Sequence, residues 1–178
     1  MARHDPLRMS RRRRKPVIMN RMMILPVTVA TVAALCVAAL GATITDLGPW
    51  YQGLEKPSWN PPDVVFPVGW TIIYALITVA GINAWRAART SIEAEWVISL
   101  FALNGFLNIL WSLIFFRMQR PDWAFAEVIV LWLSILVLIA YCGRFSRSAA
   151  LCLVPYLAWV TFAGALNWAV VDLNGPFG

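Results

Sequence analysis

Charged residues are scarce in this 178-residue chain, and their scarcity excludes an ordinary soluble fold. Only 13% of the residues are charged, whereas 60% are hydrophobic, and the mean hydropathy is +0.67. A soluble core cannot bury so large an apolar fraction, because too few polar residues remain to face water. The composition therefore predicts a protein whose surroundings are lipid.

The groups that bind metals or carry out acid–base chemistry are also scarce. The single histidine, His4, lies in a basic N-terminal stretch, and Cys36, Cys142 and Cys152 stand alone in or beside apolar runs. The spacing offers no nucleophile with a base, no paired carboxylates and no Cys/His cluster. We therefore expect no metal site, no hydrolytic active site and no obligatory cofactor.

Five apolar runs fill most of the chain, each close to the roughly 20 residues that a helix needs to cross a bilayer. None alternates with the period of a barrel strand, and helices satisfy all their backbone groups internally. The predicted fold is an all-α membrane protein, a five-transmembrane-helix bundle with a Trp/Pro-rich first loop. Its predicted spans are residues 22–45, 66–85, 95–116, 124–142 and 148–171. They form one domain over residues 22–174, followed by a short tail, 175–178.

Residues 1–21 form a basic tail that we expect to be disordered and cytoplasmic. The run Arg11 to Lys15 lies close to a membrane span, so anionic lipid is a better partner for it than nucleic acid. A signal peptide is the alternative, although the first apolar run is longer than a typical signal core. Met19 or Met22 could equally be the start of the mature chain.

The distribution of basic residues predicts the orientation of the bundle. With the N-terminus in the cytoplasm, most Lys and Arg side chains lie on the cytoplasmic side, and only Lys56, Arg117 and Arg120 remain outside. The first loop and the C-terminus then face away from the cytoplasm. This pattern suits a bacterial inner membrane.

Small residues recur at four-residue spacing in the first span, at Ala30, Ala34, Ala38 and Ala42. Such a row lets another membrane helix approach closely. It fits a seam within the bundle and the face of a homodimer equally well.

Polar and aromatic side chains gather on single faces of three spans. They are Trp70 and Tyr74; Asn104, Asn108 and Trp111; and Trp159, Phe162, Ala163 and Leu166. Counting about 1.5 Å per residue places them between the middle of the bilayer and its outer surface. A buried amide needs a partner, so the two asparagines face either a ligand pocket or neighbouring helices.

Other polar and aromatic residues have simpler interpretations. We expect Asn167 to bond to a neighbouring helix and Glu127 to lie shallow enough for its carboxylate to reach water. Tryptophans near the predicted span ends fit the interfacial aromatic belt. These tryptophans are Trp85, Trp96, Trp123 and Trp168.

The first loop, residues 46–65, contains four prolines and the aromatic residues Trp50, Tyr51 and Trp59. Each proline restricts the backbone, so the loop can hold a defined shape with few hydrogen bonds. Its aromatic side chains would otherwise form an exposed apolar patch. We therefore interpret the loop as a lid over the bundle.

These motifs resemble the TspO/MBR family of tryptophan-rich sensory proteins, the bacterial relatives of the mitochondrial translocator protein, or peripheral benzodiazepine receptor. The resemblance spans roughly residues 22–174. Its residues in the first loop and second span are Trp50-Tyr51, Leu54, Lys56-Pro57, Trp59, Pro61-Pro62, Phe66-Pro67, Trp70-Thr71 and Tyr74. Those in the third and fifth spans are Asn104, Asn108, Trp111, Phe115-Phe116, Pro155-Tyr156-Leu157, Trp159, Phe162-Ala163 and Leu166-Asn167.

The resemblance implies a bundle, often dimeric, whose pocket beneath the first loop binds porphyrins such as protoporphyrin IX and synthetic isoquinoline or benzodiazepine ligands. By motif position, the pocket would use Trp70, Tyr74, Asn104, Asn108, Trp111, Trp159, Phe162, Ala163 and Leu166, with Trp50 and Trp59 in the lid. Some members are assigned to outer membranes. The expected role is a receptor or sensor that regulates tetrapyrrole metabolism or stress responses.

Two alternatives come with the same resemblance. One is a transporter of porphyrins or other amphiphiles, although the chain shows no internal repeat and no charge at mid-membrane. The other is light-dependent degradation of bound porphyrin, with Trp159 as the oxidisable residue. The segment 166–174 lacks the tyrosine and basic residue of the sterol-recognition sequence in mitochondrial members, so we do not expect tight sterol binding.

Overall fold

The computed structural model describes the backbone of residues 16–177 and the side chains of residues 24–177. Every regular element in that range is helical, and five helices are long and apolar enough to cross a membrane. The elements are α1 (Pro16–Ile44), α2 (Pro49–Gly53), α3 (Val65–Ala87), α4 (Ser91–Ser112), the π-helical turn η1 (Leu113–Arg117), α5 (Pro121–Gly143) and α6 (Arg147–Asn174). The predicted all-α bundle of five spans is confirmed.

The helices extend slightly beyond most of the predicted span limits. The largest difference is in α1, which begins at Pro16, six residues before the predicted span. Residues 1–15 lie outside the described range. The loop also contains an unpredicted short helix, α2, which begins at Pro49, where the fixed backbone angle and missing N–H of proline favour a first turn.

Side-chain caps set the starts of α4 and α6. The Thr90 hydroxyl accepts a hydrogen bond from the Glu93 N–H at 3.1 Å, and the Glu93 carboxylate accepts one from the Arg89 N–H at 2.6 Å. The Ser146 hydroxyl accepts a hydrogen bond from the Ala149 N–H at 3.3 Å. Each cap satisfies N–H groups that the first helical turn leaves free. The α3–α4 and α5–α6 connections are therefore short and well defined.

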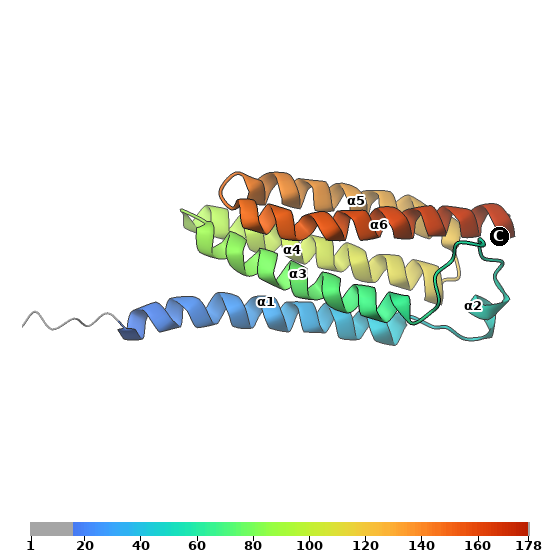
Figure 1. Cartoon of the computed structure of the whole chain (residues 1–178), viewed down its shortest axis with the longest axis horizontal. Coiled ribbons are helices and arrows are strands. Elements are labelled where there is room, and N and C mark those ends of the chain that lie inside the picture. The colour runs from blue at the N-terminus through green and yellow to red at the C-terminus, as the bar shows by residue number, and fades with distance from the viewer. Residues whose placement is uncertain (1–15, 178) are drawn as a thin grey trace, which may run out of the picture.

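The five long helices run side by side, with α1 along the edge of the group formed by α3, α4, α5 and α6 (Figure 1). The core lies within that group of four and includes Ala80, Ile135, Leu138, Leu153 and Tyr156. By contrast, α1 is the least buried of the five spans. It is thus a peripheral helix, attached mainly to α3 and α4.

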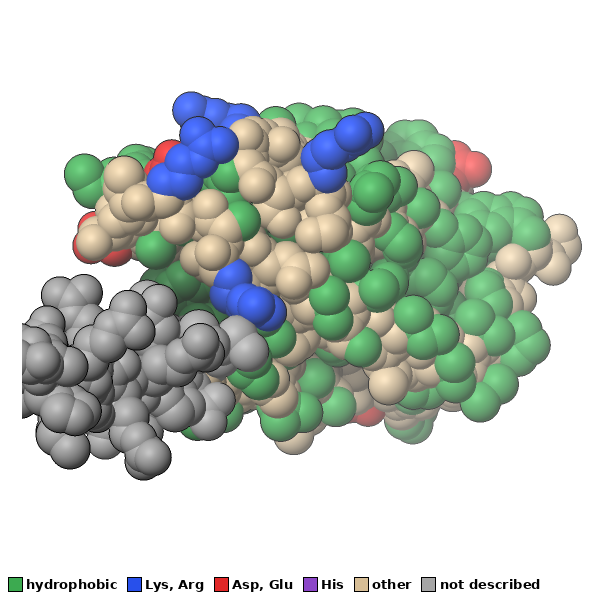
Figure 2. Space-filling model, turned by 60° about the vertical axis from the view of Figure 1, so that its left-hand side comes forward, with side chains coloured by type: hydrophobic (Ala, Val, Ile, Leu, Met, Phe, Trp, Pro, Cys, Tyr) green, Lys and Arg blue, Asp and Glu red, His purple; other side chains and the backbone are tan. Residues whose placement is uncertain are grey.

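The two ends of the bundle differ in character. The first loop, α2 and the C-terminus lie together at one end, which we call the loop end, and the α3–α4 and α5–α6 connections lie at the opposite end (Figure 1). Lys and Arg side chains gather at the opposite end, beside a flank dominated by apolar side chains (Figure 2). The sequence places Arg86, Arg89, Arg144 and Arg147 there.

Candidate ligand-binding site

Aromatic side chains from the loop, α3 and α6 meet near the loop end. We call this group the loop-facing cluster: Trp59, Phe66, Trp70, Tyr74, Trp159 and Phe162. Trp70 stacks on Tyr74 with ring centroids 5.4 Å apart and meets Trp159 edge-on at 6.1 Å. The loop joins the cluster through Trp59, whose ring lies 5.9 Å from that of Phe162. A Trp of the loop therefore packs against an aromatic side chain of α6.

Trp159 has two unusual features at the centre of this cluster. Its indole lies so close to α3 that a Cβ atom added at Gly69 would be 2.4 Å from the ring, so only glycine fits there. Its indole N–H is buried, and it finds no hydrogen-bond partner within residues 24–177. Buried polar groups are almost always paired, and a lone unpaired donor calls for an explanation.

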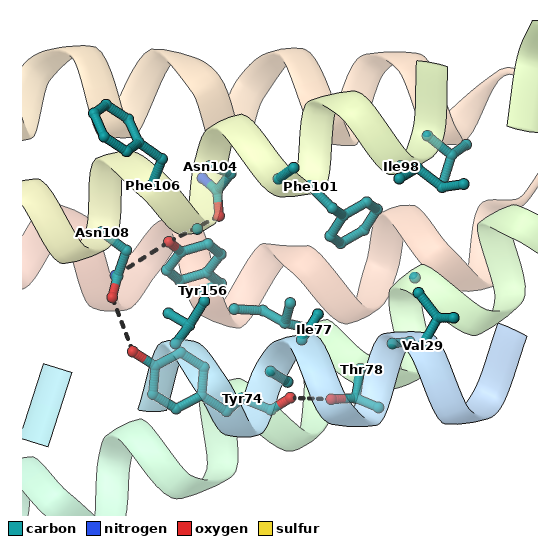
Figure 3. Close-up of a pocket in the computed structure, with 18 of the residues that line it drawn as sticks. Val29, Tyr74, Ile77, Thr78, Ile98, Phe101, Asn104, Phe106, Asn108 and Tyr156 are labelled. Atoms are coloured by element: carbon teal, nitrogen blue, oxygen red, sulfur yellow. Dashed lines mark hydrogen bonds between the residues drawn. The ribbon is translucent and has the colours of Figure 1, made fainter. Parts of the chain in front are cut away.

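A chain of hydrogen bonds crosses the bundle beside this cluster (Figure 3). The Tyr74 hydroxyl donates to Asn108 Oδ1 at 2.8 Å, and Asn108 Nδ2 donates to the Tyr156 hydroxyl at 3.4 Å. The Tyr156 hydroxyl donates to Asn104 Oδ1 at 3.1 Å, and Asn104 Nδ2 donates to Ser134 Oγ at 2.8 Å. This polar network joins α3, α4, α5 and α6, and it satisfies the buried amides that the sequence placed inside a span.

A separate aromatic group occupies the loop end between the loop, α4 and η1. This second cluster consists of Trp50, Tyr51, Trp111, Phe115 and Phe116. Trp111 stacks on Phe115 at 5.2 Å, and Trp50 meets Phe115 edge-on at 6.0 Å. Burial raises the pKa of the Tyr51 hydroxyl, with a further contribution from the charge of Asp63. Trp50 and Trp111 are thus packed together, apart from the loop-facing cluster.

Polar contacts brace the loop internally and attach its start to the bundle. Lys56 Nζ donates a hydrogen bond to the Tyr51 carbonyl at 2.9 Å and lies 4.3 Å from the centre of the Tyr51 ring. The Arg117 guanidinium donates to the Thr43 carbonyl at 2.8 Å, and it pairs with Asp46 at 3.5 Å. Arg117 of η1 therefore connects the start of the loop to the end of α1.

A cavity of about 390 Å³ lies between α1, α3 and α4, with Tyr156 of α6 at its back (Figure 3). We call it the lateral cavity. Three predicted site residues, Tyr74, Asn104 and Asn108, line it, whereas Trp159 and Phe162 do not. Its remaining walls are apolar and include the α1 residues Val29, Ala30, Ala33, Ala34 and Val37.

The structure divides the predicted site residues into three groups. Trp59, Trp70, Tyr74, Trp159 and Phe162 meet in the loop-facing cluster, and Ala163 and Leu166 lie half-buried on the same stretch of α6. The two asparagines belong to the polar network, and Trp50 and Trp111 to the second cluster. Tyr74 connects the first two groups, because it stacks on Trp70 and also bonds to Asn108.

The sequence did not predict Tyr156 or Ser134 as site residues, although both complete the polar network. The signal for Tyr156 was available, since a tyrosine in the middle of a span needs a partner for its hydroxyl. The prediction for Asn167 is confirmed: its Nδ2 donates to the Pro121 carbonyl at 2.8 Å, and its Oδ1 accepts from the Trp111 indole at 3.1 Å. Ser134 carried no such signal, because serine is common inside helices.

One prediction needs correction, and one of the tryptophans near the span ends differs from the others. Glu127 does not reach water: it is only 8% exposed, and neither carboxyl oxygen has a hydrogen-bond partner within residues 24–177. It lies on the face of α5 that packs into the bundle, so depth along the helix was a poor guide to exposure. Trp85 is half-buried and lines the lateral cavity, whereas the other three tryptophans near the span ends are more than half exposed.

Comparison with known proteins places the chain among membrane proteins of one family. The profile of the TspO/MBR family matches residues 27–172. The Tryptophan-rich protein TspO of Chlorobaculum tepidum is 38% identical over 160 residues, which cover 88% of this chain and 99% of the relative. The Tryptophan-rich sensory protein of Cereibacter sphaeroides is 37% identical over 125 residues, 70% of this chain and 77% of the relative.

A mammalian protein shows the same similarity at a greater distance. The Translocator protein of Homo sapiens is 31% identical over 122 residues, which cover 68% of this chain and 72% of the relative. These relatives carry the names of sensory and translocator proteins, not of enzymes. Together with the five apolar helices, the matches identify an integral membrane protein. The chain belongs to the TspO/MBR family of membrane proteins.

Proposed function

We propose that this protein is a membrane receptor or sensor that binds porphyrins of the protoporphyrin IX type beneath its first loop and regulates tetrapyrrole metabolism or a stress response. Synthetic isoquinoline and benzodiazepine compounds are further ligands of the same site. The loop-facing cluster supplies the chemistry, since aromatic rings can pack against the faces of a flat macrocycle. The nearby polar network can form hydrogen bonds with the polar edge of the macrocycle.

The observation that carries this proposal is the unpaired indole N–H of Trp159. A buried donor without an acceptor lowers stability by about 1 to 3 kcal/mol, so its presence favours a partner that the protein alone does not provide. Porphyrins have ring nitrogens and carboxylates that accept hydrogen bonds. A porphyrin within the loop-facing cluster would satisfy the indole and cover the surrounding aromatic rings.

The proposal is tested by titrating the purified protein with protoporphyrin IX and following quenching of tryptophan fluorescence. We expect saturable binding that is about tenfold weaker in Trp159→Phe, because that change removes one hydrogen bond of roughly 1.4 kcal/mol and keeps an aromatic ring. Trp168→Phe is the matched control, since Trp168 lies on the same helix and is 53% exposed.

Two outcomes would count against the proposal. Absence of saturable quenching in the wild-type protein would reject the porphyrin receptor. Equal affinities of the wild-type protein and Trp159→Phe would move the binding site away from this indole. Uptake of porphyrin into proteoliposomes that saturates with concentration would favour transport over sensing.

The orientation in the membrane and the oligomeric state are part of the same proposal. The N-terminus and the basic end of the bundle face the cytoplasm of a bacterial inner membrane, and the loop end faces away, in accordance with the bias of Lys and Arg. A homodimer is part of the proposal, but Ala30 and Ala34 line the lateral cavity, so the row of small residues forms a seam within the bundle and the dimer face lies elsewhere. Labelling of single cysteines introduced at Ser58 and Ser91 from either side of the membrane tests the orientation.

A further inference from the structure

The lateral cavity is largely separate from the loop-facing cluster. It extends from Trp85, near the opposite end of α3, to Tyr74 and Asn108 in the polar network. Tyr74 belongs to both sites, whereas Trp159 and Phe162 do not line the cavity. The proposed porphyrin site therefore leaves most of this space unexplained.

The rim of the cavity faces the side of the bundle. Val29 of α1 is 39% exposed, and Ile98 and Phe106 of α4 are 41% and 60% exposed. In a membrane-spanning bundle, such exposed apolar side chains within the spans contact lipid. The cavity is thus adjacent to lipid, on the side where α1 and α4 line it.

The walls of the cavity offer an occupant mainly apolar contacts. Ala30, Ala33, Ala34 and Gly81 leave the space open, because their side chains are too small to fill it. The polar groups at the inner end are already paired: the Tyr74 hydroxyl bonds to Asn108, and Asn108 to Tyr156. An apolar chain would therefore fit without leaving a buried polar group unpaired.

We propose that an acyl chain of a membrane phospholipid occupies the lateral cavity, entering between α1 and α4. An apolar cavity without an occupant loses the dispersion contacts of its lining atoms, and acyl chains are the apolar material at its rim. The site takes lipid whether or not a porphyrin binds beneath the loop.

Two basic residues indicate which phospholipid the site prefers. Arg86 directly follows the cavity residue Trp85 in the last turn of α3, and Arg89 lies two residues beyond the end of that helix, where the span meets the membrane surface. Both are exposed, and neither forms an ion pair with another residue in the described range 24–177. An anionic headgroup would meet them while its acyl chain extends towards Tyr74.

The test uses vesicles of phosphatidylglycerol or phosphatidylcholine whose acyl chains carry a photoreactive diazirine. After illumination, mass spectrometry measures the label on Ile77 and Phe101, which line the cavity and are only partly exposed. We expect both residues to be labelled in the wild-type protein, and the label to fall several-fold in Ala34→Trp, which fills the space. Absence of label on these two residues in the wild-type protein would overturn the proposal.

Matched variants separate a filled cavity from a damaged fold. Ala39→Trp adds the same side chain at an exposed position of α1 outside the cavity. In this variant, Ile77 and Phe101 should be labelled as strongly as in the wild-type protein. Gly81→Leu fills the cavity from α3 and should reproduce the loss of label if Ala34→Trp does not fold. Undiminished label in a folded filling variant would also overturn the proposal.

The same experiment tests the headgroup preference by comparing the labelling from the two lipids. Phosphatidylglycerol should label the cavity residues more strongly than phosphatidylcholine, and the double variant Arg86→Gln, Arg89→Gln should remove that difference. Equal labelling by both lipids in the wild-type protein would overturn the assignment of an anionic headgroup. Porphyrin is absent throughout, so failure here is distinct from failure of the proposed receptor function.

Discussion

The side chain of Asn174 bonds to both backbone groups of Glu55, a residue 119 positions earlier in the chain. Asn174 Oδ1 accepts from the Glu55 N–H at 2.8 Å, and Asn174 Nδ2 donates to the Glu55 carbonyl at 2.8 Å. The same Nδ2 also donates to the Val170 carbonyl within α6. The last residue of α6 therefore holds the middle of the first loop in place.

Asn174→Ala should release the loop without unfolding the bundle. It removes two hydrogen bonds to the loop backbone, each contributing about 0.5 to 1.5 kcal/mol. We expect faster exchange of the Glu55 amide hydrogen and faster proteolysis within residues 46–65, measured by mass spectrometry. Asp172→Ala is the control, since Asp172 is exposed on α6. Unchanged exchange at Glu55 would mean that other contacts hold the loop.

Gly69→Ala should destabilise the protein and disturb the loop-facing cluster. The added Cβ atom would lie 2.4 Å from the Trp159 ring, so the ring or α3 must shift, at a cost of about 1 to 3 kcal/mol. Gly53→Ala is the matched control, because nothing lies within 4 Å of the added atom there. Thermal unfolding compares the two variants. A wild-type melting temperature in Gly69→Ala would show that the Trp159 ring moves freely.

Tyr156→Phe should lower stability through the polar network. The Tyr156 hydroxyl donates to Asn104 and accepts from Asn108, and its loss leaves two buried amides partly unpaired, at a cost of about 1 to 3 kcal/mol. Tyr141→Phe tests the general effect of removing a hydroxyl, since no bond to the Tyr141 hydroxyl occurs within the described part of the chain. Equal melting temperatures for the two variants would contradict the network's contribution.

Glu127→Gln should leave stability unchanged or raise it. Both carboxyl oxygens are sealed from solvent without a partner in the described residues, and a charge in such surroundings is costly. Glutamine keeps nearly the same shape and cannot ionise. Glu127→Ala, by contrast, should lower stability, because it leaves a cavity between α5 and its neighbours. A marked fall in melting temperature for Glu127→Gln would reveal a partner for the carboxylate.

Trp159→Phe should also suppress light-driven bleaching of bound protoporphyrin IX. If the indole supplies the oxidisable group, phenylalanine removes it, while weaker binding remains measurable. Absorbance at saturating protein during illumination separates loss of reaction from loss of binding, with Trp168→Phe as the control. Bleaching at the wild-type rate in Trp159→Phe would exclude this indole from the photochemistry.

The sequence predicted the spans well and the grouping of site residues only in part. Counting residues from the end of a helix estimates depth in the membrane, but not which neighbour a side chain faces. On that count Trp111 lies in the outer half of the bundle and Trp159 near its middle, yet Trp111 packs on Phe115 and Trp159 on Gly69. The same limit led to the wrong expectation for Glu127, which is shallow along α5 but turned into the bundle.

Composition and the length of the apolar runs by themselves determined a helical membrane protein. In lipid, a run of this length satisfies its backbone hydrogen bonds by forming a helix. The Trp-Pro loop and the motifs in three spans likewise determined the family. Only the tertiary structure decided that α1 stands apart and leaves a cavity, and that Asn174 holds Glu55. Those features depend on how helices rotate and pack against one another, and distant side chains set that packing jointly.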